Sequence, residues 1–259
     1  MANHLLRVAV AVIVLALSVA VSAQTAQDVA RLRRAAEAGD ANAQYKLGQM
    51  YGRGLGVPQD YTQAVAWWRR AADQGDADAQ YNLGVMYANG RGVPQDDRQA
   101  VAWYRKAADQ GVAYAQYNLG RAYDLGLGVP KDDTQAVAWW RRAADQGDAD
   151  AQNNLGVMYE NGRGVPQDDR QAVAWYRKAA DQGDARAQFN LGRTYAIGKG
   201  VPQDDVLAYM WFNLAASRSS DETDRQIRDT VSARLTPQQR ADGQRMAREW
   251  QTAFEKRKQ

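Results

Sequence analysis

Pairs of aspartates are the residues of this sequence whose type and spacing could do chemistry. Two carboxylates facing each other across a cleft can hydrolyse a glycosidic bond, and carboxylate oxygens can bind calcium. Here each pair stands at the predicted start of a helix, which favours N-capping, and the loops lack the alternating ligand spacing of a calcium-binding loop. We therefore predict no catalytic residue and no metal site. The pairs are Asp96-Asp97, Asp132-Asp133, Asp168-Asp169 and Asp204-Asp205.

The composition excludes other chemistries. The sequence has no cysteine, and its one histidine, His4, lies in the leader predicted over residues 1–23, so the mature chain is expected to have neither thiol nor imidazole. Disulfides, thiolate sites, zinc sites and Ser-His-Asp catalysis therefore have no residues to use. The 33 basic and 30 acidic residues nearly cancel and form no basic stripe of the kind that duplex nucleic acid requires. We expect a protein that is not an enzyme, has no cofactor and does not bind nucleic acid.

A stretch of 36 residues recurs five times and organises the chain. Each copy cannot bury its apolar face alone and needs neighbours on both sides, so a fixed period predicts a stack of supersecondary units. The five predicted repeats are residues 39–74, 75–110, 111–146, 147–182 and 183–218.

Each repeat predicts two helices joined by a turn. In the first copy, apolar residues at helical spacing place one helix from about Ala41 to Tyr51 and another from about Tyr61 to Asp73. Between them, G-x-G-V-P-Q-D supplies glycines for positive φ, a proline that stops the helix, and a D-x-x-Q capping box. The fold class is therefore all-α, an α/α solenoid of helix-turn-helix repeats.

Small and aromatic residues hold fixed places in every repeat. Gly48 and its copies lie inside the first helix, where glycine costs up to about 1 kcal/mol, so we predict a close approach of two helix backbones there. Trp67 and its copies hold one position of the second helix. We interpret them as core residues, with an aromatic ladder for ligand stacking as the alternative.

The two ends differ from the repeats. Residues 1–23 combine Arg7, an apolar run from Val8 to Val21 and a small-residue cleavage site, which predicts a signal peptide cut after Ala23. The run is short of the roughly 20 residues of a spanning helix, although a retained anchor is the alternative. Residues 24–38 resemble half a repeat and predict an N-terminal capping helix. Residues 219–259 predict two C-terminal capping helices, which would cover an apolar stripe on the last repeat.

The repeat motif resembles that of a known family. The segments A-x-A-Q-x-x-L-G-x-x-Y, G-x-G-V-P-x-D and A-x-x-W-Y/W-x-x-A-A-x-Q-G are similar to those of the Sel-one-like repeat family, a relative of tetratricopeptide repeats. They cover about 180 residues, the five repeats. The resemblance implies an α/α solenoid that acts as a protein-binding scaffold, in bacteria often outside the cytoplasm.

Differences between the repeats indicate where a partner binds. Residues 75–110 and 147–182 differ only at Tyr81/Asn153 and Ala88/Glu160, seven residues apart on the first helix and hence on one face. The resemblance implies that this face lines a concave groove. We expect a peptide or helix of a partner protein to bind there; neutral drift on an exposed face is the alternative. The predicted groove residues are Asn42, Tyr45, Gln49, Tyr81, Val85, Tyr114, Tyr117, Arg121, Asp124, Asn153, Val157, Glu160, Arg186, Phe189 and Arg193.

These features lead to one functional expectation. We expect a non-enzymatic adaptor of the bacterial cell envelope, periplasmic or secreted and not stably inserted in a membrane, which assembles a complex or regulates a membrane receptor. The alternatives are a protein that binds cell-wall glycan and, with less support, a hydrolase that uses carboxylates. The partner's identity and the oligomeric state do not follow from the sequence.

Overall fold

The computed structural model describes residues 27–219 and 221–258, which contain helices and turns but no strand. The predicted signal peptide, with its cleavage site after Ala23, lies outside these residues. The described helices group into two compact units, of which the first ends at Val112 and the second begins at Ala113. Across these residues, no helix combines the length and the apolar character that crossing a bilayer requires.

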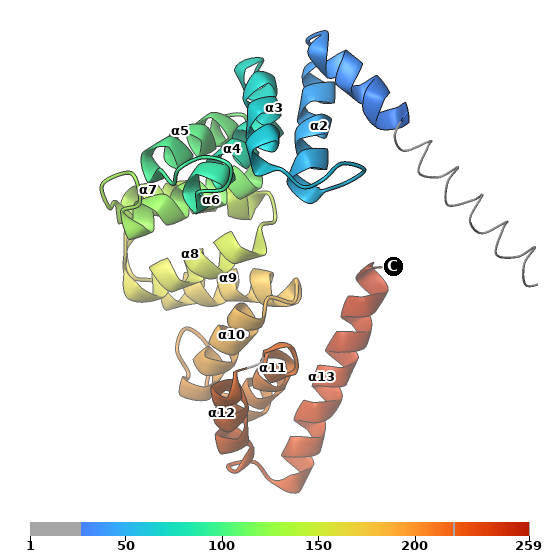
Figure 1. Ribbon diagram of the computed structural model, residues 1–259. Helices are drawn as coiled ribbons and strands as arrows, with labels where there is room; N and C mark the ends of the chain where they lie inside the picture. Colours follow the sequence, from blue (N-terminus) through green and yellow to red (C-terminus); the bar gives the residue numbers. More distant parts are fainter. Residues whose placement is uncertain (1–26, 220, 259) are drawn as a thin grey trace, which may run out of the picture. The chain divides into compact units, whose positions relative to one another are not determined.

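The first unit holds the N-terminal helix and the first two repeats (Figure 1). A helix over residues 27–37 comes first, and its Arg31 is exposed, as expected of an end cap. The helices that follow are α2 (Ala41–Arg53), α3 (Tyr61–Asp73), α4 (Ala77–Asn89) and α5 (Asp97–Asp109). The predicted pair of helices in each repeat is thus confirmed.

The second unit holds the other three repeats and the C-terminal helices. Its repeats consist of α6 (Ala113–Leu125), α7 (Asp133–Asp145), α8 (Ala149–Asn161), α9 (Asp169–Asp181), α10 (Ala185–Ile197) and α11 (Asp205–Arg218). Two more helices follow, α12 (Glu222–Ser232) and α13 (Pro237–Lys258). Thr236 and Gln239 form a capping box at the start of α13: the N–H of Thr236 donates to the side chain of Gln239 at 2.9 Å, and the N–H of Gln239 donates to the hydroxyl of Thr236 at 3.3 Å.

The glycine inside each first helix makes room for a ring rather than for a backbone. A Cβ added at Gly48 would lie 2.5 Å from the indole of Trp68, and one at Gly156 would lie 2.4 Å from the ring of Tyr176. The predicted close contact therefore exists, but the prediction of two helix backbones was wrong. The aromatic residue of the second helix fills the space that glycine leaves.

The repeated tryptophans are core residues, as predicted. Trp67, Trp103, Trp139, Trp175 and Trp211 are each at most 9% exposed. In the first repeat, Trp67 packs with Ala36, Ala43 and Leu47. In the first four repeats, a cation three residues further along the helix lies over the indole, as with Arg70 at 4.5 Å from the ring centroid of Trp67.

Buried glutamines tie each repeat to its neighbour. Gln152 of α8 donates to the carbonyl of Ala144 in α7 at 3.1 Å, and its Oε1 accepts from Gln182 at the end of α9 at 2.8 Å. The same pair of bonds recurs at Gln80 in the first unit. A buried amide with both groups satisfied stabilises the stack without the penalty of an unpaired polar atom.

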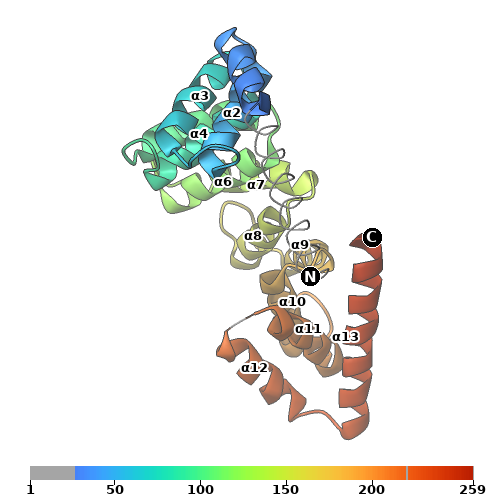
Figure 2. The same ribbon diagram turned by 45° about the vertical axis from the view of Figure 1, so that its right-hand side comes forward.

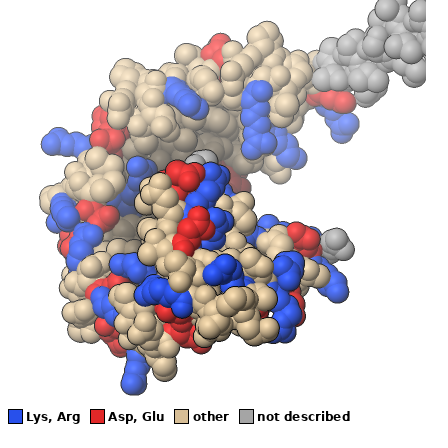
Figure 3. Space-filling model, turned by 90° about the horizontal axis from the view of Figure 1, so that it is seen from below, with Lys and Arg blue, Asp and Glu red and all other residues tan. Residues whose placement is uncertain are grey.

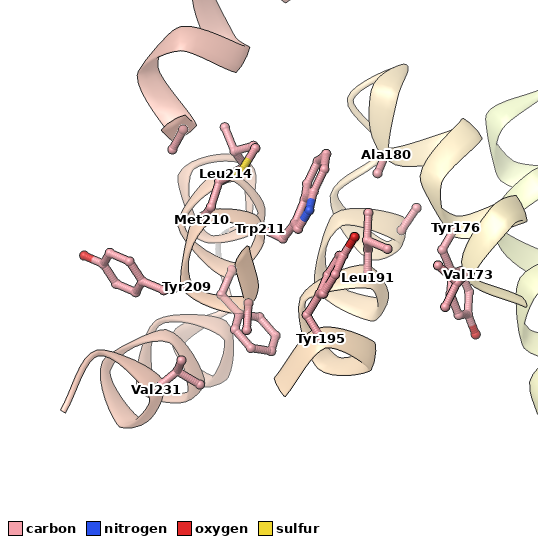
Figure 4. Packing of buried hydrophobic residues seen from close by; sticks show 14 of the residues in the cluster. Val173, Tyr176, Ala180, Leu191, Tyr195, Tyr209, Met210, Trp211, Leu214 and Val231 are labelled. Carbon is pink, nitrogen blue, oxygen red and sulfur yellow. The ribbon is translucent and has the colours of Figure 1, made fainter. Parts of the chain in front are cut away.

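The C-terminal helices cover the last repeat. Both views show α11 between α12 and α13 (Figures 1 and 2). Met210 and Leu214 of α11 are buried in a cluster with Val231 of α12 and Ala247 of α13 (Figure 4). The apolar stripe on the last repeat is therefore covered as predicted.

Candidate functional site

The first aspartate of each pair is a helix cap. Asp96 accepts a hydrogen bond from the backbone N–H of Gln99 at 3.0 Å, and Asp168 caps α9 in the same way. The glutamine side chain does not complete the predicted box, because the N–H of Asp96 donates to the carbonyl of Tyr87 instead. In the described part of the chain, no group of three or more acidic, histidine or cysteine side chains could hold a metal ion.

In the first unit, the predicted groove residues lie on the same sides of α2 and α4. Asn42 is exposed, whereas Tyr45, Gln49, Tyr81 and Val85 are half-buried. The amide of Gln49 donates to the hydroxyl of Tyr45 at 2.6 Å. Burial, together with the nearby carboxylates of Asp78 and Asp76, raises the pKa of Tyr45. This face is therefore aromatic, with the carboxylates of Asp76 and Asp78 close to Tyr45.

In the second unit, charged side chains from three successive repeats act on Tyr117. Burial raises its pKa, the charge of Asp150 raises it further, and Arg186 and Arg121 oppose this. These groups come from α6, α8 and α10, so consecutive first helices present one face. Arg121 and Tyr114 are both exposed, the latter by 65%. The structure thus brings together Tyr117, Arg121 and Arg186 of the predicted set.

A hollow of about 520 Å³ lies at the C-terminal end of this face. Arg186, Phe189 and Asn190 line it from α10, and Arg218 and Asp221 line it near the end of α11 and the start of α12. The ring of Phe189 packs edge-on against Phe212, with centroids 5.2 Å apart. One wall of the hollow is therefore an aromatic ring that packs on the core.

Two predicted residues, Asn153 and Glu160, are buried and do not line an open face. Asn153 accepts a hydrogen bond from Asn190 at 3.0 Å. Glu160 is 6% exposed; it accepts from the hydroxyl of Tyr176 at 2.7 Å and pairs with Arg193 at 2.5 Å. Their side chains bind the fourth repeat to the fifth, since Asn190 and Arg193 belong to α10.

Polar contacts explain why Glu160 remains charged. Burial alone would raise its pKa, but the hydrogen bond from Tyr176 and the charges of Arg193 and Lys199 outweigh burial and lower it. The pKa of Tyr176 is raised, chiefly by burial and then by its bond to Glu160. The ionised carboxylate is thus the acceptor that this cluster is built around.

Asp124 and Val157 are also engaged within the chain. Asp124 pairs with Arg163 at 2.5 Å, and the same guanidinium binds Asp133 at 2.6 Å. Val157 is half-buried and packs against the core of the last repeats. With Arg193, which pairs with Glu160, five of the predicted residues therefore connect repeats, and the remainder are the candidates for contact with a partner.

Sequence reasoning missed Arg218, which lines the hollow. It stands where the four preceding repeats have glutamine, at Gln74, Gln110, Gln146 and Gln182, so comparing repeats at this position would have found it. Its guanidinium donates to the side chains of Gln188 at 3.2 Å and Gln251 at 2.5 Å. Burial lowers the pKa of Arg218, which carries its charge in a partly desolvated place.

Charges of both signs are interspersed on the face of the molecule drawn in Figure 3. This agrees with the near balance of basic and acidic residues in the sequence. A surface of this kind does not select partners by charge alone. Recognition must then depend on the particular aromatic and charged side chains that each face presents.

The fold and this face define the class of protein, a helical repeat scaffold built as an α/α solenoid. The family model of the Sel1 repeat matches residues 41–76, 77–112, 113–148, 149–184 and 185–220. These matches cover more than half of the chain, which therefore belongs to the Sel1 repeat family. Proteins of this family generally mediate protein–protein interactions and are generally non-catalytic.

Solved structures agree with this assignment. A protective antigen of uropathogenic Escherichia coli with an SLR fold is 38% identical, with a TM-score of 0.78 over 87% of this chain. This chain covers 49% of that protein, about half its length. A Sel1 repeat protein from Oxalobacter formigenes is 32% identical, with a TM-score of 0.72 over 86% of this chain and 99% of that one. A comparison with curated proteins found no match.

Proposed function

We propose that this protein is a non-enzymatic scaffold of the bacterial cell envelope that binds a peptide or helix of a partner protein on its first helices. The observation that supports this most directly is the group around Tyr117, where Arg186 of α10 pairs with Asp150 of α8 and both act, with Arg121 of α6, on the tyrosine of α6. In this role the protein assembles an envelope complex or regulates a membrane receptor.

The residue types suit such a role. Tyrosine and arginine are enriched among the residues that dominate binding energy at interfaces, because each combines a large contact area with polar groups. The half-buried ring of Tyr117 is already positioned, so binding would cost it little conformational freedom. The hollow beside Phe189 offers a place for one side chain of the partner.

The cellular location is part of the proposal. It depends on the leader over residues 1–23, whose composition is that of a signal peptide. The test is the intact mass of the protein from fractionated cells that express the full sequence. We expect a chain that begins at Gln24 in the periplasm or medium; an uncut chain in the cytoplasm would contradict the location.

The binding proposal is tested by replacing Tyr81, Tyr117 and Arg121 together with alanine. We expect recovery of partners from the native envelope fraction to fall at least tenfold in a pull-down, while the helical circular dichroism signal stays intact. The matched control replaces Arg98, Gln99 and Gln135, which are exposed on the second helices, and should recover partners normally.

Two outcomes would contradict the proposal. One is unchanged recovery by the triple variant with its helices intact. The other is binding of the protein to purified peptidoglycan that the same three substitutions abolish, because this would assign the face to a glycan rather than to a protein.

A further inference from the structure

A second surface exposes apolar side chains on the loops between the two helices of a repeat. Five large hydrophobic residues are exposed in the described part of the chain. Four of them lie at this loop: Leu55 in the first repeat, Leu125 and Leu127 in the third, and Ile197 in the fifth. They are between 39 and 60% exposed. The odd-numbered repeats thus share exposed apolar residues at this loop, which lie apart from the first-helix face.

The even-numbered repeats show that the loop does not need these apolar residues. The position of Leu125 and Ile197 holds Asn89 and Asn161, each of which donates to a backbone carbonyl of its own helix. The next glycine keeps the same left-handed backbone, with φ of 71° at Gly126 and 65° at Gly162. The exposed leucines and isoleucine are therefore not required by the turn.

In the second unit, the three loops form one continuous edge. Arg163 of the middle loop binds Asp124 and Asp133 beside the first loop, at 2.5 and 2.6 Å. Lys199 of the last loop lies 3.4 Å from Asp169. The backbones also touch, since a Cβ added at Gly164 would lie 2.3 Å from the carbonyl of Asp133.

A hollow of about 570 Å³ lies on this edge, next to Ile197. Asp168, Asp169 and Arg170 line it from the start of α9, and Gly198 and Val201 line it from the last loop. Its walls are therefore two carboxylates, the side chain of Arg170, backbone and aliphatic side chains. The hollow can hold an apolar side chain of a partner next to the carboxylates.

The net charge of the three loops is negative, although the second aspartate of each pair lies in an ion pair within the chain. From the end of each first helix to the start of each second helix, every loop in the second unit has one basic residue and two acidic ones. The three sets are Lys131, Asp132 and Asp133; Arg163, Asp168 and Asp169; and Lys199, Asp204 and Asp205. An occupant that complements this edge therefore has basic residues interleaved with apolar ones.

We propose that the edge formed by loops 125–133, 161–169 and 197–205 docks a cationic amphipathic segment of a partner protein. Its apolar residues cover Leu125, Leu127 and Ile197, and its lysines or arginines face the aspartates at the starts of the second helices. This surface is separate from the first-helix face, so one scaffold could hold two partners at once.

The probe is a synthetic amphipathic peptide of leucine and lysine, with a leucine and glutamate peptide of the same pattern as the control. Binding to the full chain is measured by fluorescence anisotropy at 50 and 200 mM salt. The main variant combines Leu125→Asn, Leu127→Gln and Ile197→Asn, which change no charge. We expect its Kd for the lysine peptide to rise at least tenfold, and the glutamate peptide not to bind.

A second variant tests the charge. Asp132→Asn with Asp168→Asn keeps two good N-capping residues but removes two negative charges. We expect a Kd several-fold higher than that of the natural protein at 50 mM salt and little difference at 200 mM, because salt screens exposed charges. The alanine variant at Tyr81, Tyr117 and Arg121 should bind the peptide normally, which keeps this test independent of the first-helix face.

Several results would overturn the proposal. They include an unchanged Kd in the apolar variant and equal binding of the two peptides. Concentration-dependent dimers in sedimentation velocity that the apolar variant abolishes would assign the edge to a second copy of the chain. Binding to phosphatidylcholine vesicles with 30% phosphatidylglycerol that the same variant abolishes would assign it to a membrane surface.

Discussion

Two repeats of this protein differ at only two of their 36 positions, yet the side chains at those positions make different contacts in the two repeats. In residues 75–110, Tyr81 packs against Tyr104 with ring centroids 6.0 Å apart, and Ala88 is half-buried. In residues 147–182, Asn153 and Glu160 are buried and bind side chains of the next repeat. Two substitutions thus replace an aromatic surface contact with an ionic connection between repeats.

The comparison shows that a difference between near-identical repeats need not mark a partner site. A carboxylate at position 160 can be buried because three groups from two repeats satisfy it, namely Tyr176, Arg193 and Lys199. The identical second helix in the earlier repeat has Tyr104 at the place of Tyr176. The two repeats therefore differ in the carboxylate of Glu160 and in the cations that contact it, whereas their second helices are the same.

The largest expected effect comes from removing the acid. Glu160→Ala gives the fourth repeat the alanine of the second and leaves the hydroxyl of Tyr176 without its buried acceptor. We expect the free energy of unfolding to fall by about 2 kcal/mol, the range for a buried hydrogen-bonding group that loses a charged partner. Urea denaturation followed by circular dichroism measures this. No loss of stability would show that the cluster contributes nothing.

The stability that Glu160 gives the fourth repeat is expected to depend on pH. The folded-state pKa of Glu160 lies below its ordinary value of 4.5, so the unfolded chain takes up the proton first as pH falls. The stability that the charge provides is complete at pH 7 and is lost as pH falls below about 4.5. We expect the difference in unfolding free energy between the natural protein and Glu160→Gln, on the order of 1 kcal/mol at pH 7, to shrink by pH 3.

A difference between the two proteins that stays constant from pH 7 to pH 3 would contradict this. The comparison with glutamine is chosen because its amide oxygen can still accept from Tyr176. The remaining difference therefore reports the charge rather than the hydrogen bond.

The smallest effect is expected when the fourth repeat is made identical to the second. Adding Asn153→Tyr to Glu160→Ala should restore about 0.5 to 1 kcal/mol, because the new ring can pack against Tyr176 as Tyr81 packs against Tyr104. The double variant is compared with Glu160→Ala by urea denaturation at pH 7. A further loss of stability would mean that the fourth repeat has no room for the ring.

Most of the fold could be predicted because it is local. The glycine and proline of each turn, the capping aspartate and the helical spacing of Leu47 and Trp67 are all set within one repeat. The five repeats have the same pattern, so each copy supports the same prediction of helices and turns. The candidate site could be predicted only in part, because whether a polar residue is buried or exposed depends on which side chains of the next repeat contact it.

The sequence by itself determined the period, the helix boundaries and the residues that face the core, because each follows from short-range sterics and from apolar spacing. Only the tertiary structure decided that Glu160 is an internal ion-pair partner while Tyr117 and Arg121 stay at the surface. The physical reason is that a carboxylate is buried only where opposite charge and hydrogen-bond donors surround it. That condition depends on Arg193 and Lys199, which lie more than 30 residues further along the chain.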